Sequence, residues 1–288
     1  MRFGYSLLSI CFASWLLLGC TTHQVHSSAR VQVTADNFAP SETQTIDTLL
    51  RVSATSRLVT GIDHWMIGRI QKQFDSVSET TLMPIFESAM ENFAEDNIMS
   101  GVKVSVSQHY HSQYMAQLLN WYDSGIGKAY SSRSTQVDTN SAEFKAWFQV
   151  ADFETPQASL VREILDVSQT LEMIETRMLV PHQGMSMGWQ QASRRAGIQA
   201  TGYPESSINT QIVKAQNVAV MCAMYKYRDL SAEQLREIIV FEKSSAARWY
   251  YGVIHNGMQN ALYQASRRMS EGMTRSVMLR VEREMPKT

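Results

Sequence analysis

Apolar residues recur at steps of three and four along most of the chain, the spacing that places them on one face of an α-helix. Between residues 160 and 178 the apolar positions are Leu160, Ile164, Val167, Leu171, Ile174 and Met178, and this spacing predicts one helix. A second helix is expected after Ser231, where Gln234 stands three residues later as in a capping box. The longest period-two alternation, Val102 to Val106, is too short to indicate a sheet. The pattern therefore predicts an all-α protein.

Two stretches of this pattern occur twice in the same order. The first pair lies 115 residues apart and the second pair 120 residues apart. The matched positions are 49–53 with 164–168, 118–124 with 238–244, Lys128 with Arg248, and Tyr130 with Tyr250. Two matches in one order predict a duplicated helical module, folded as two related lobes.

The N-terminus has the layout of a secretory signal. Arg2 precedes an apolar run over 5–18, which is shorter than the roughly 20 residues that a membrane-spanning helix needs. The run ends in Leu17-Leu18-Gly19-Cys20, which resembles the signal of bacterial lipoproteins, where acyl chains such as palmitate are attached to the cysteine. We therefore expect Cys20 to be the lipidation site. An ordinary cleaved signal with a chance cysteine is the alternative.

Lipid on Cys20 would hold the protein at a membrane. The residue after Cys20 is Thr21 rather than the aspartate that often retains lipoproteins at the inner membrane, which favours the outer membrane, facing the periplasm. The expected order of segments is a signal peptide over 1–19, a lipid-anchored tether over 20–44, a helical repeat over 45–135, a connecting segment over 136–159, a second repeat over 160–255 and a C-terminal helix over 256–288.

Charge and cysteine content narrow the function classes. Loss of the signal removes one basic residue, Arg2, and leaves 25 basic side chains against 27 acidic ones. A nucleic-acid-binding protein normally has a basic excess, so we expect no nucleic-acid partner. Cys222 would be the one cysteine left beside the lipidated Cys20, which allows no internal disulfide. The fold must then be held by its apolar core.

The repeated segments carry a short aromatic and serine motif. It stands as Trp121, Ser124 and Lys128 in the first copy and as Phe241, Ser244 and Arg248 in the second. With the preceding Leu-Leu-x-Val-Ser helix, this pattern is similar to the domain of unknown function family 2059, a family of secreted bacterial helical domains. Gly125 and Ser245 stand where that family usually has proline. The resemblance implies a helical fold and no known activity.

One string matches a hydrolase motif. Gly184, Ser186 and Gly188 satisfy G-x-S-x-G, and Asp229 and His255 follow in the order of an acid and a histidine. The hydrolase motif requires a buried strand before the serine, whereas Pro181 stands at that place. A helix–helix connection punctuated by glycine is therefore the expected structure, and the hydrolase remains the third hypothesis for function.

The same stretch suggests a soft metal site. His182, Met185 and Met187 offer imidazole and thioether ligands, which suit Cu(I). Because the chain has 17 methionines, core packing is the simpler explanation for these residues.

These patterns predict a non-enzymatic envelope lipoprotein that serves as an interaction or scaffold module. Its expected partners are the membrane, through Cys20, and another envelope protein, and no cofactor is predicted. Periplasmic copper binding is the alternative function.

Overall fold

The structure is a computed structural model, and it describes residues 40–133, 137–198 and 206–285. These residues form helices with no strand among them, so the prediction of an all-α fold is confirmed. Cys20 and the predicted signal lie outside the described residues. No helix of the described part is long and apolar enough to cross a membrane.

The first half of the described chain forms short helices. In order they are α1 (Pro40–Val52), the 3-10 helix η2 (Thr55–Leu58), α2 (Ile62–Gln73), α3 (Glu79–Asn92), α4 (Glu95–Gln108), α5 (Ser112–Asp123) and α6 (Gly125–Ser132). The second half is α7 (Ala142–Val150), α8 (Pro156–Val167), α9 (Thr170–Ala196), α10 (Ser206–Tyr227), α11 (Ala232–Glu242), α12 (Ser245–Gly272) and α13 (Arg275–Glu284).

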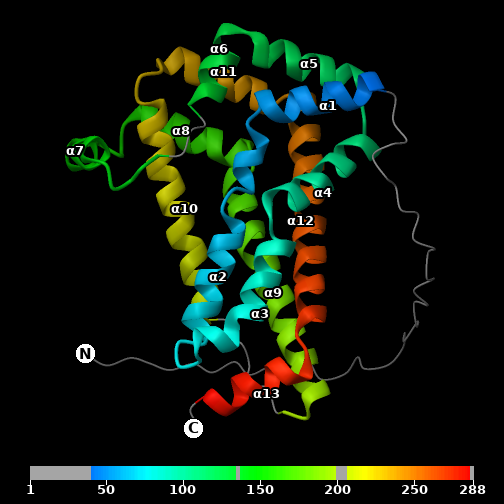
Figure 1. Ribbon diagram of the computed structural model, residues 1–288. Coiled ribbons are helices and arrows are strands. Elements are labelled where there is room, and N and C mark those ends of the chain that lie inside the picture. The colour runs from blue at the N-terminus through cyan, green and yellow to red at the C-terminus, as the bar shows by residue number, and fades with distance from the viewer. Residues whose placement is uncertain (1–39, 134–136, 199–205, 286–288) are drawn as a thin grey trace, which may run out of the picture. The chain divides into compact units, whose positions relative to one another are not determined.

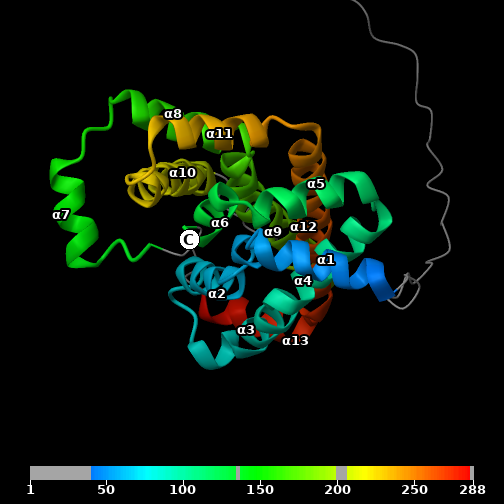
Figure 2. The same ribbon diagram turned by 90° about the horizontal axis from the view of Figure 1, so that it is seen from above.

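Helix α12 packs extensively against several of the other helices. It lies along α9 and α4, and it also contacts α3 and α5 (Figure 1). Its buried face includes Tyr250, Ile254, Met258 and Leu262, and this face belongs to the largest apolar core. A second core joins α8, α10 and α11, which lie together beside α9 (Figure 2).

Glycines allow the long helices to approach closely. In α9, a Cβ atom at Gly184 would overlap Ser266 of α12, and one at Gly188 would overlap Ser270. Ser270 also donates a hydrogen bond of 3.3 Å to the carbonyl of Gly184. The G-x-S-x-G string is therefore a helix-crossing motif inside α9. The expected helix–helix connection at this place is wrong, because α9 runs unbroken past Pro181.

Several expected boundaries also differ from the observed ones. The single helix expected over 160–178 is divided after Val167, because Gln169 takes a left-handed conformation with φ 55°. Helix α1 begins at Pro40, inside the expected tether, and the boundary expected at residue 255 falls inside α12. The described residues belong to one compact unit, in which α12, which spans the end of the second expected repeat and part of the expected C-terminal helix, packs against α3, α4 and α5 of the first repeat.

Candidate ligand-binding pocket

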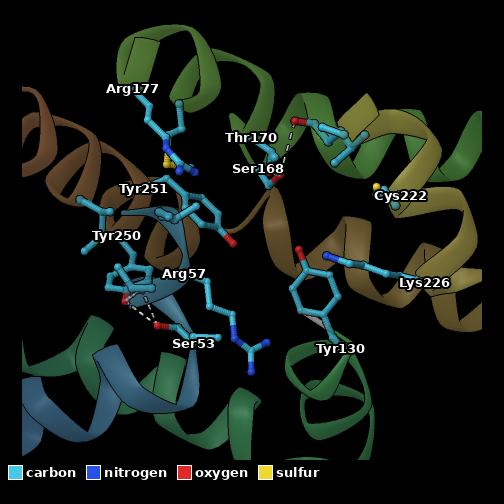
Figure 3. Close-up of a pocket in the computed structure, with 18 of the residues that line it drawn as sticks. Ser53, Arg57, Tyr130, Ser168, Thr170, Arg177, Cys222, Lys226, Tyr250 and Tyr251 are labelled. Atoms are coloured by element: carbon cyan, nitrogen blue, oxygen red, sulfur yellow. Dashed lines mark hydrogen bonds between the residues drawn. The ribbon is translucent and has the colours of Figure 1, made fainter. Parts of the chain in front are cut away.

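A cavity of about 510 Å³ lies where the ends of η2 and α6 meet α9, α10 and α12. Five tyrosines from helices α5, α6, α10 and α12 give it much of its wall. They are Tyr122, Tyr130, Tyr227, Tyr250 and Tyr251. Figure 3 shows three of them, Tyr130, Tyr250 and Tyr251. Five smaller residues with hydroxyl side chains also line the cavity, namely Ser53, Thr55, Thr60, Ser168 and Thr170. The wall therefore combines aromatic rings with many hydrogen-bonding groups.

The charged residues of the wall are all cationic. Arg57 comes from η2, Arg177 from α9 and Lys226 from α10, and the lining contains no aspartate or glutamate. Within the described ranges, none of the three forms an ion pair with a carboxylate. Burial lowers the pKa of Lys226, while the nearby Cys222 thiol raises it and the nearby charge of Arg57 lowers it. This repulsion between cations favours the binding of an anion.

Arg177 is fixed at one side of the pocket. Its guanidinium donates a hydrogen bond of 2.6 Å to the backbone carbonyl of Thr60. Burial lowers the pKa of Arg177 from its ordinary value, although arginine stays charged at neutral pH. The positive charge is therefore held in place before any ligand arrives.

Behind the tyrosines lies one buried acid. Glu242 has no exposed surface, and the Tyr251 hydroxyl donates a hydrogen bond of 2.9 Å to its Oε1 atom. Burial raises the pKa of Glu242 to about 7, although the hydroxyls of Tyr251 and Tyr130 oppose this rise. Burial and then the Glu242 charge raise the pKa values of Tyr130 and Tyr251 well above the ordinary value. At neutral pH the pocket therefore presents neutral phenols.

Two similar turns contribute hydroxyls to the pocket. In the first, Ala54 has φ 56° and separates Ser53 from Thr55, whose hydroxyl oxygens lie 2.7 Å apart. In the second, Gln169 has φ 55° and separates Ser168 from Thr170, whose hydroxyl oxygens are also 2.7 Å apart. These are the two non-glycine residues with positive φ in the part of the chain that the structure describes.

The residues of the predicted hydrolase are not brought together. Ser186 lies in the middle of α9, and His255 instead places its Nε2 atom 2.7 Å from the hydroxyl of Thr176. Thr176 precedes Ser186 by ten residues on the same helix, which is roughly 15 Å along the axis. Asp229 follows the far end of α10 and lines a surface hollow with Glu143 of α7.

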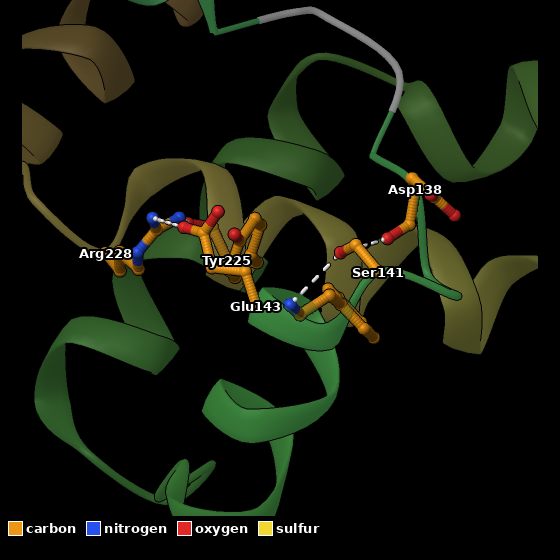
Figure 4. A network of polar contacts seen from close by, with 6 residues as sticks. Asp138, Ser141, Glu143, Tyr225 and Arg228 are labelled. Atoms are coloured by element: carbon orange, nitrogen blue, oxygen red, sulfur yellow. Dashed lines mark hydrogen bonds and ion pairs between the residues drawn. The ribbon is translucent and has the colours of Figure 1, made fainter.

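That hollow is built by a polar network that attaches α7 to α10 (Figure 4). Arg228 forms an ion pair of 3.0 Å with Glu143 and lies over the ring of Tyr225 at 3.8 Å from its centroid. Ser141 caps α7 by accepting a hydrogen bond from the backbone N–H of Phe144. These contacts explain the position of α7 and leave Asp229 remote from Ser186.

The predicted metal ligands also point apart. His182 and Met185 are 2% and 3% exposed, whereas Met187 is 52% exposed on another side of α9. Arg69 donates a hydrogen bond of 3.0 Å to Nδ1 of His182, and burial and then this cation lower the pKa of His182 to about 4. A cation at this nitrogen would be repelled by Arg69. In the described residues, no group of three or more His, Cys, Asp or Glu side chains is placed to hold a metal ion.

The residues of the repeated motif act in the framework next to the pocket. Trp121 and Phe241, which the sequence match makes equivalent, stack with ring centroids 3.6 Å apart. Ser124 and Ser244 each cap the following helix, because each serine hydroxyl accepts a hydrogen bond from the backbone N–H three residues later. Lys128 pairs with Asp123 at 2.7 Å, whereas Arg248 is exposed.

Sequence reasoning did not identify the pocket cations Arg57, Arg177 and Lys226. They are separated by up to 169 positions and stand in no common motif. The Ser-x-Thr sequence after each leucine-rich segment was the available signal, since it occurs in both copies at 53–55 and 168–170.

Comparisons with known proteins give a single partial similarity to report. No family model matches the chain, and no solved structure matches it. Ketol-acid reductoisomerase (NADP(+)) from Aliivibrio fischeri is 31% identical over 127 residues, which cover 42% of this chain and 24% of that enzyme. The chain therefore spans about a quarter of the length of this relative. So short a match shows no family and assigns no activity.

Proposed function

We propose that this protein is a non-catalytic binding protein whose central pocket takes a small organic anion with an aromatic or apolar body. The observation that supports this most is the set of three cations, Arg57, Arg177 and Lys226, in a wall that contains no carboxylate. Like charges around one cavity repel one another, and a negative ligand relieves that repulsion.

The size and lining of the pocket support the same proposal. Its volume of about 510 Å³ falls in the range of roughly 300–1,000 Å³ that is typical of small-molecule sites. Tyrosine rings supply apolar contact area at low loss of side-chain entropy, and their hydroxyls remain hydrogen-bonding partners. A molecule with one negative end and a flat apolar body satisfies both parts of the wall.

We place this activity in the bacterial cell envelope, because the sequence resembles a lipoprotein signal ending at Cys20. The proposal keeps the interaction module that the sequence predicts and specifies a small molecule as one ligand. We also propose that the two halves arose by duplication. The stacked pair Trp121 and Phe241 and the two Ser-x-Thr turns support this origin.

A matched pair of ligands tests the proposal. The probes are 2-naphthoate and its neutral analogue 2-naphthamide, with binding to the full protein measured by isothermal titration calorimetry. We expect naphthoate to bind more tightly than the amide, and Lys226→Met to weaken naphthoate about tenfold, the effect of losing one charge-assisted contact.

The control is Lys214→Met, which removes the same charge from an exposed position of the same helix, α10. Equal affinity of the wild-type protein for the two probes would refute an anion site. An effect of Lys214→Met as large as that of Lys226→Met would show that the overall charge, and not the pocket, attracts the ligand.

A further inference from the structure

The first Ser-x-Thr turn is completed by a phenol from another helix. The Tyr250 hydroxyl lies 2.7 Å from Ser53 Oγ and 2.7 Å from Thr55 Oγ1. With the 2.7 Å between Ser53 and Thr55 themselves, the three hydroxyl oxygens form a closed triangle. Each hydroxyl can donate one hydrogen bond and accept others, so the triangle satisfies its members without any charge.

The second turn repeats two corners of that triangle. Ser168 Oγ lies 2.7 Å from Thr170 Oγ1 and 3.4 Å from the carbonyl of Leu165, just as Ser53 lies 3.3 Å from the carbonyl of Leu50. Both turns have a non-glycine residue in the left-handed region. Such backbone costs roughly 1–2 kcal/mol for an L-residue and tends to persist where it has a function.

The third corner of the second turn is not filled in the same way. The sequence match makes Tyr130 the counterpart of Tyr250, but the Tyr130 hydroxyl interacts with Glu242 instead. Ser168 and Thr170 line the cavity, and Figure 3 shows them across the cavity from Tyr130 and Lys226. The second turn therefore carries no phenol and borders the cavity, mainly through Thr170, because Ser168 is 2% exposed.

We propose that a hydroxyl group of the bound ligand fills this third corner, hydrogen-bonded to Ser168 and Thr170 as Tyr250 is bonded to Ser53 and Thr55. This inference rests on the proposed function, and it narrows the ligand class to hydroxyaryl anions. The phenolic end binds the Ser168–Thr170 turn, and the acidic end is left for the cationic side chains of the wall.

The chemistry of the turn favours a phenol over a second acidic group. The Tyr250 triangle demonstrates that this geometry accepts a phenolic oxygen at hydrogen-bonding distance from both side chains. A ring that carries the hydroxyl also matches the tyrosine-rich wall, since aromatic rings pack favourably against one another.

The test compares 6-hydroxy-2-naphthoate with 2-naphthoate, which lacks only the hydroxyl. We expect the hydroxy acid to bind wild-type protein about five- to tenfold more tightly, the effect of one hydrogen-bonded group. In Thr170→Val, which keeps the shape of the side chain and removes its hydroxyl, we expect this preference to fall to about one. Thr45→Val makes the same change on α1, outside the pocket lining, and should keep the full preference.

The outcomes separate the two proposals. Unchanged affinity of Thr170→Val for 2-naphthoate shows that the variant is folded and that its pocket is intact. A preference of about one in the wild-type protein, or a preference retained in Thr170→Val, overturns the hydroxyl site while naphthoate still binds better than naphthamide. Loss of the difference between naphthoate and naphthamide overturns the anion pocket itself, and the hydroxyl site with it.

Discussion

Glu242 and His182 are two buried ionisable residues whose pKa values are shifted in opposite directions. Glu242 is fully buried and its pKa is raised to about 7, whereas His182 is 2% exposed and its pKa is lowered to about 4. Burial favours the neutral form of both side chains, which for glutamate is the protonated form and for histidine the deprotonated form. Their effects on stability therefore have opposite signs as the pH changes.

The first prediction concerns the pH dependence of Glu242. Between pH 4.5 and about 7 the folded protein holds a proton that the unfolded chain has released, so the free energy of unfolding decreases as the pH rises. The Glu242→Gln variant does not show this decrease in the free energy of unfolding. Between pH 4.5 and about 7 we expect the free energy of unfolding of the variant to rise by about 3 kcal/mol relative to that of the wild-type protein, because one pKa unit corresponds to about 1.4 kcal/mol. Urea unfolding at pH 5, 6, 7 and 8 measures the difference.

The difference in free energy of unfolding between wild type and Glu242→Gln contains the contribution of Glu242 without that of His182. His182 stabilises the folded state above pH 6.5, and this contribution is lost as the pH falls toward 4. Because His182 is present in both proteins, its contribution cancels. Glu237→Gln is a control, since this glutamate is exposed. Parallel stability curves for wild type and Glu242→Gln would contradict a raised pKa of Glu242.

Helices α9 and α12 can cross at close distance because α9 has glycines, which lack a side chain, at the crossing. A methyl group at Gly188 would overlap Ser270 of α12, whereas one at Gly252 would meet no atom within 4 Å. Both glycines lie inside long helices, where alanine is intrinsically the better residue. Alanine substitution at these two positions therefore distinguishes the effect of helix propensity from the effect of contact between the helices.

The second prediction follows from this contrast. Gly188→Ala is expected to lower the free energy of unfolding by about 1–3 kcal/mol, because the helices must move apart. Gly252→Ala is expected to raise it by about 0.5–1 kcal/mol through helix propensity alone. Thermal or urea unfolding followed by circular dichroism measures both. Stabilisation by Gly188→Ala would mean that α9 and α12 do not approach closely there.

For the whole folded unit, α12 makes the two expected repeats dependent on each other. Gly257 of α12 packs against Val102 and Ser105 of α4, and Ser105 donates a hydrogen bond of 2.9 Å to the carbonyl of Val253. On its other side α12 packs against α9. Separating α4 from α12 would expose the apolar faces that these two helices bury against each other.

The third prediction is a single cooperative unfolding transition. Far-ultraviolet circular dichroism and tryptophan fluorescence should give the same midpoint, as for one folding unit. A fragment over 156–285 lacks α3, α4 and α5 and should fail to unfold cooperatively, because the α12 face that they cover is exposed. Two separate transitions in the full protein, or a cooperatively folded fragment, would show that the halves are independent lobes.

Local sequence signals predicted the helical class and the start of the helix after Ser231. The capping box of Ser231 and Gln234 is confirmed. The division of the 160–178 helix was not predicted, because Gln169 has no special preference for the left-handed region. Its conformation is one that the bonds of the folded turn sustain, including the one between Ser168 and Thr170.

The amino-acid sequence by itself determined the helical class and the capped start of the helix after Ser231, because these depend on side-chain spacing and on bonds within one turn. The predictions about Cys20 and the envelope also come from sequence alone. Only the tertiary structure decided which polar residues share a pocket. Ser53 meets Tyr250 across 197 positions, and Glu242 is buried among tyrosines from several helices. Such contacts depend on how helices pack, which no local pattern of residues specifies.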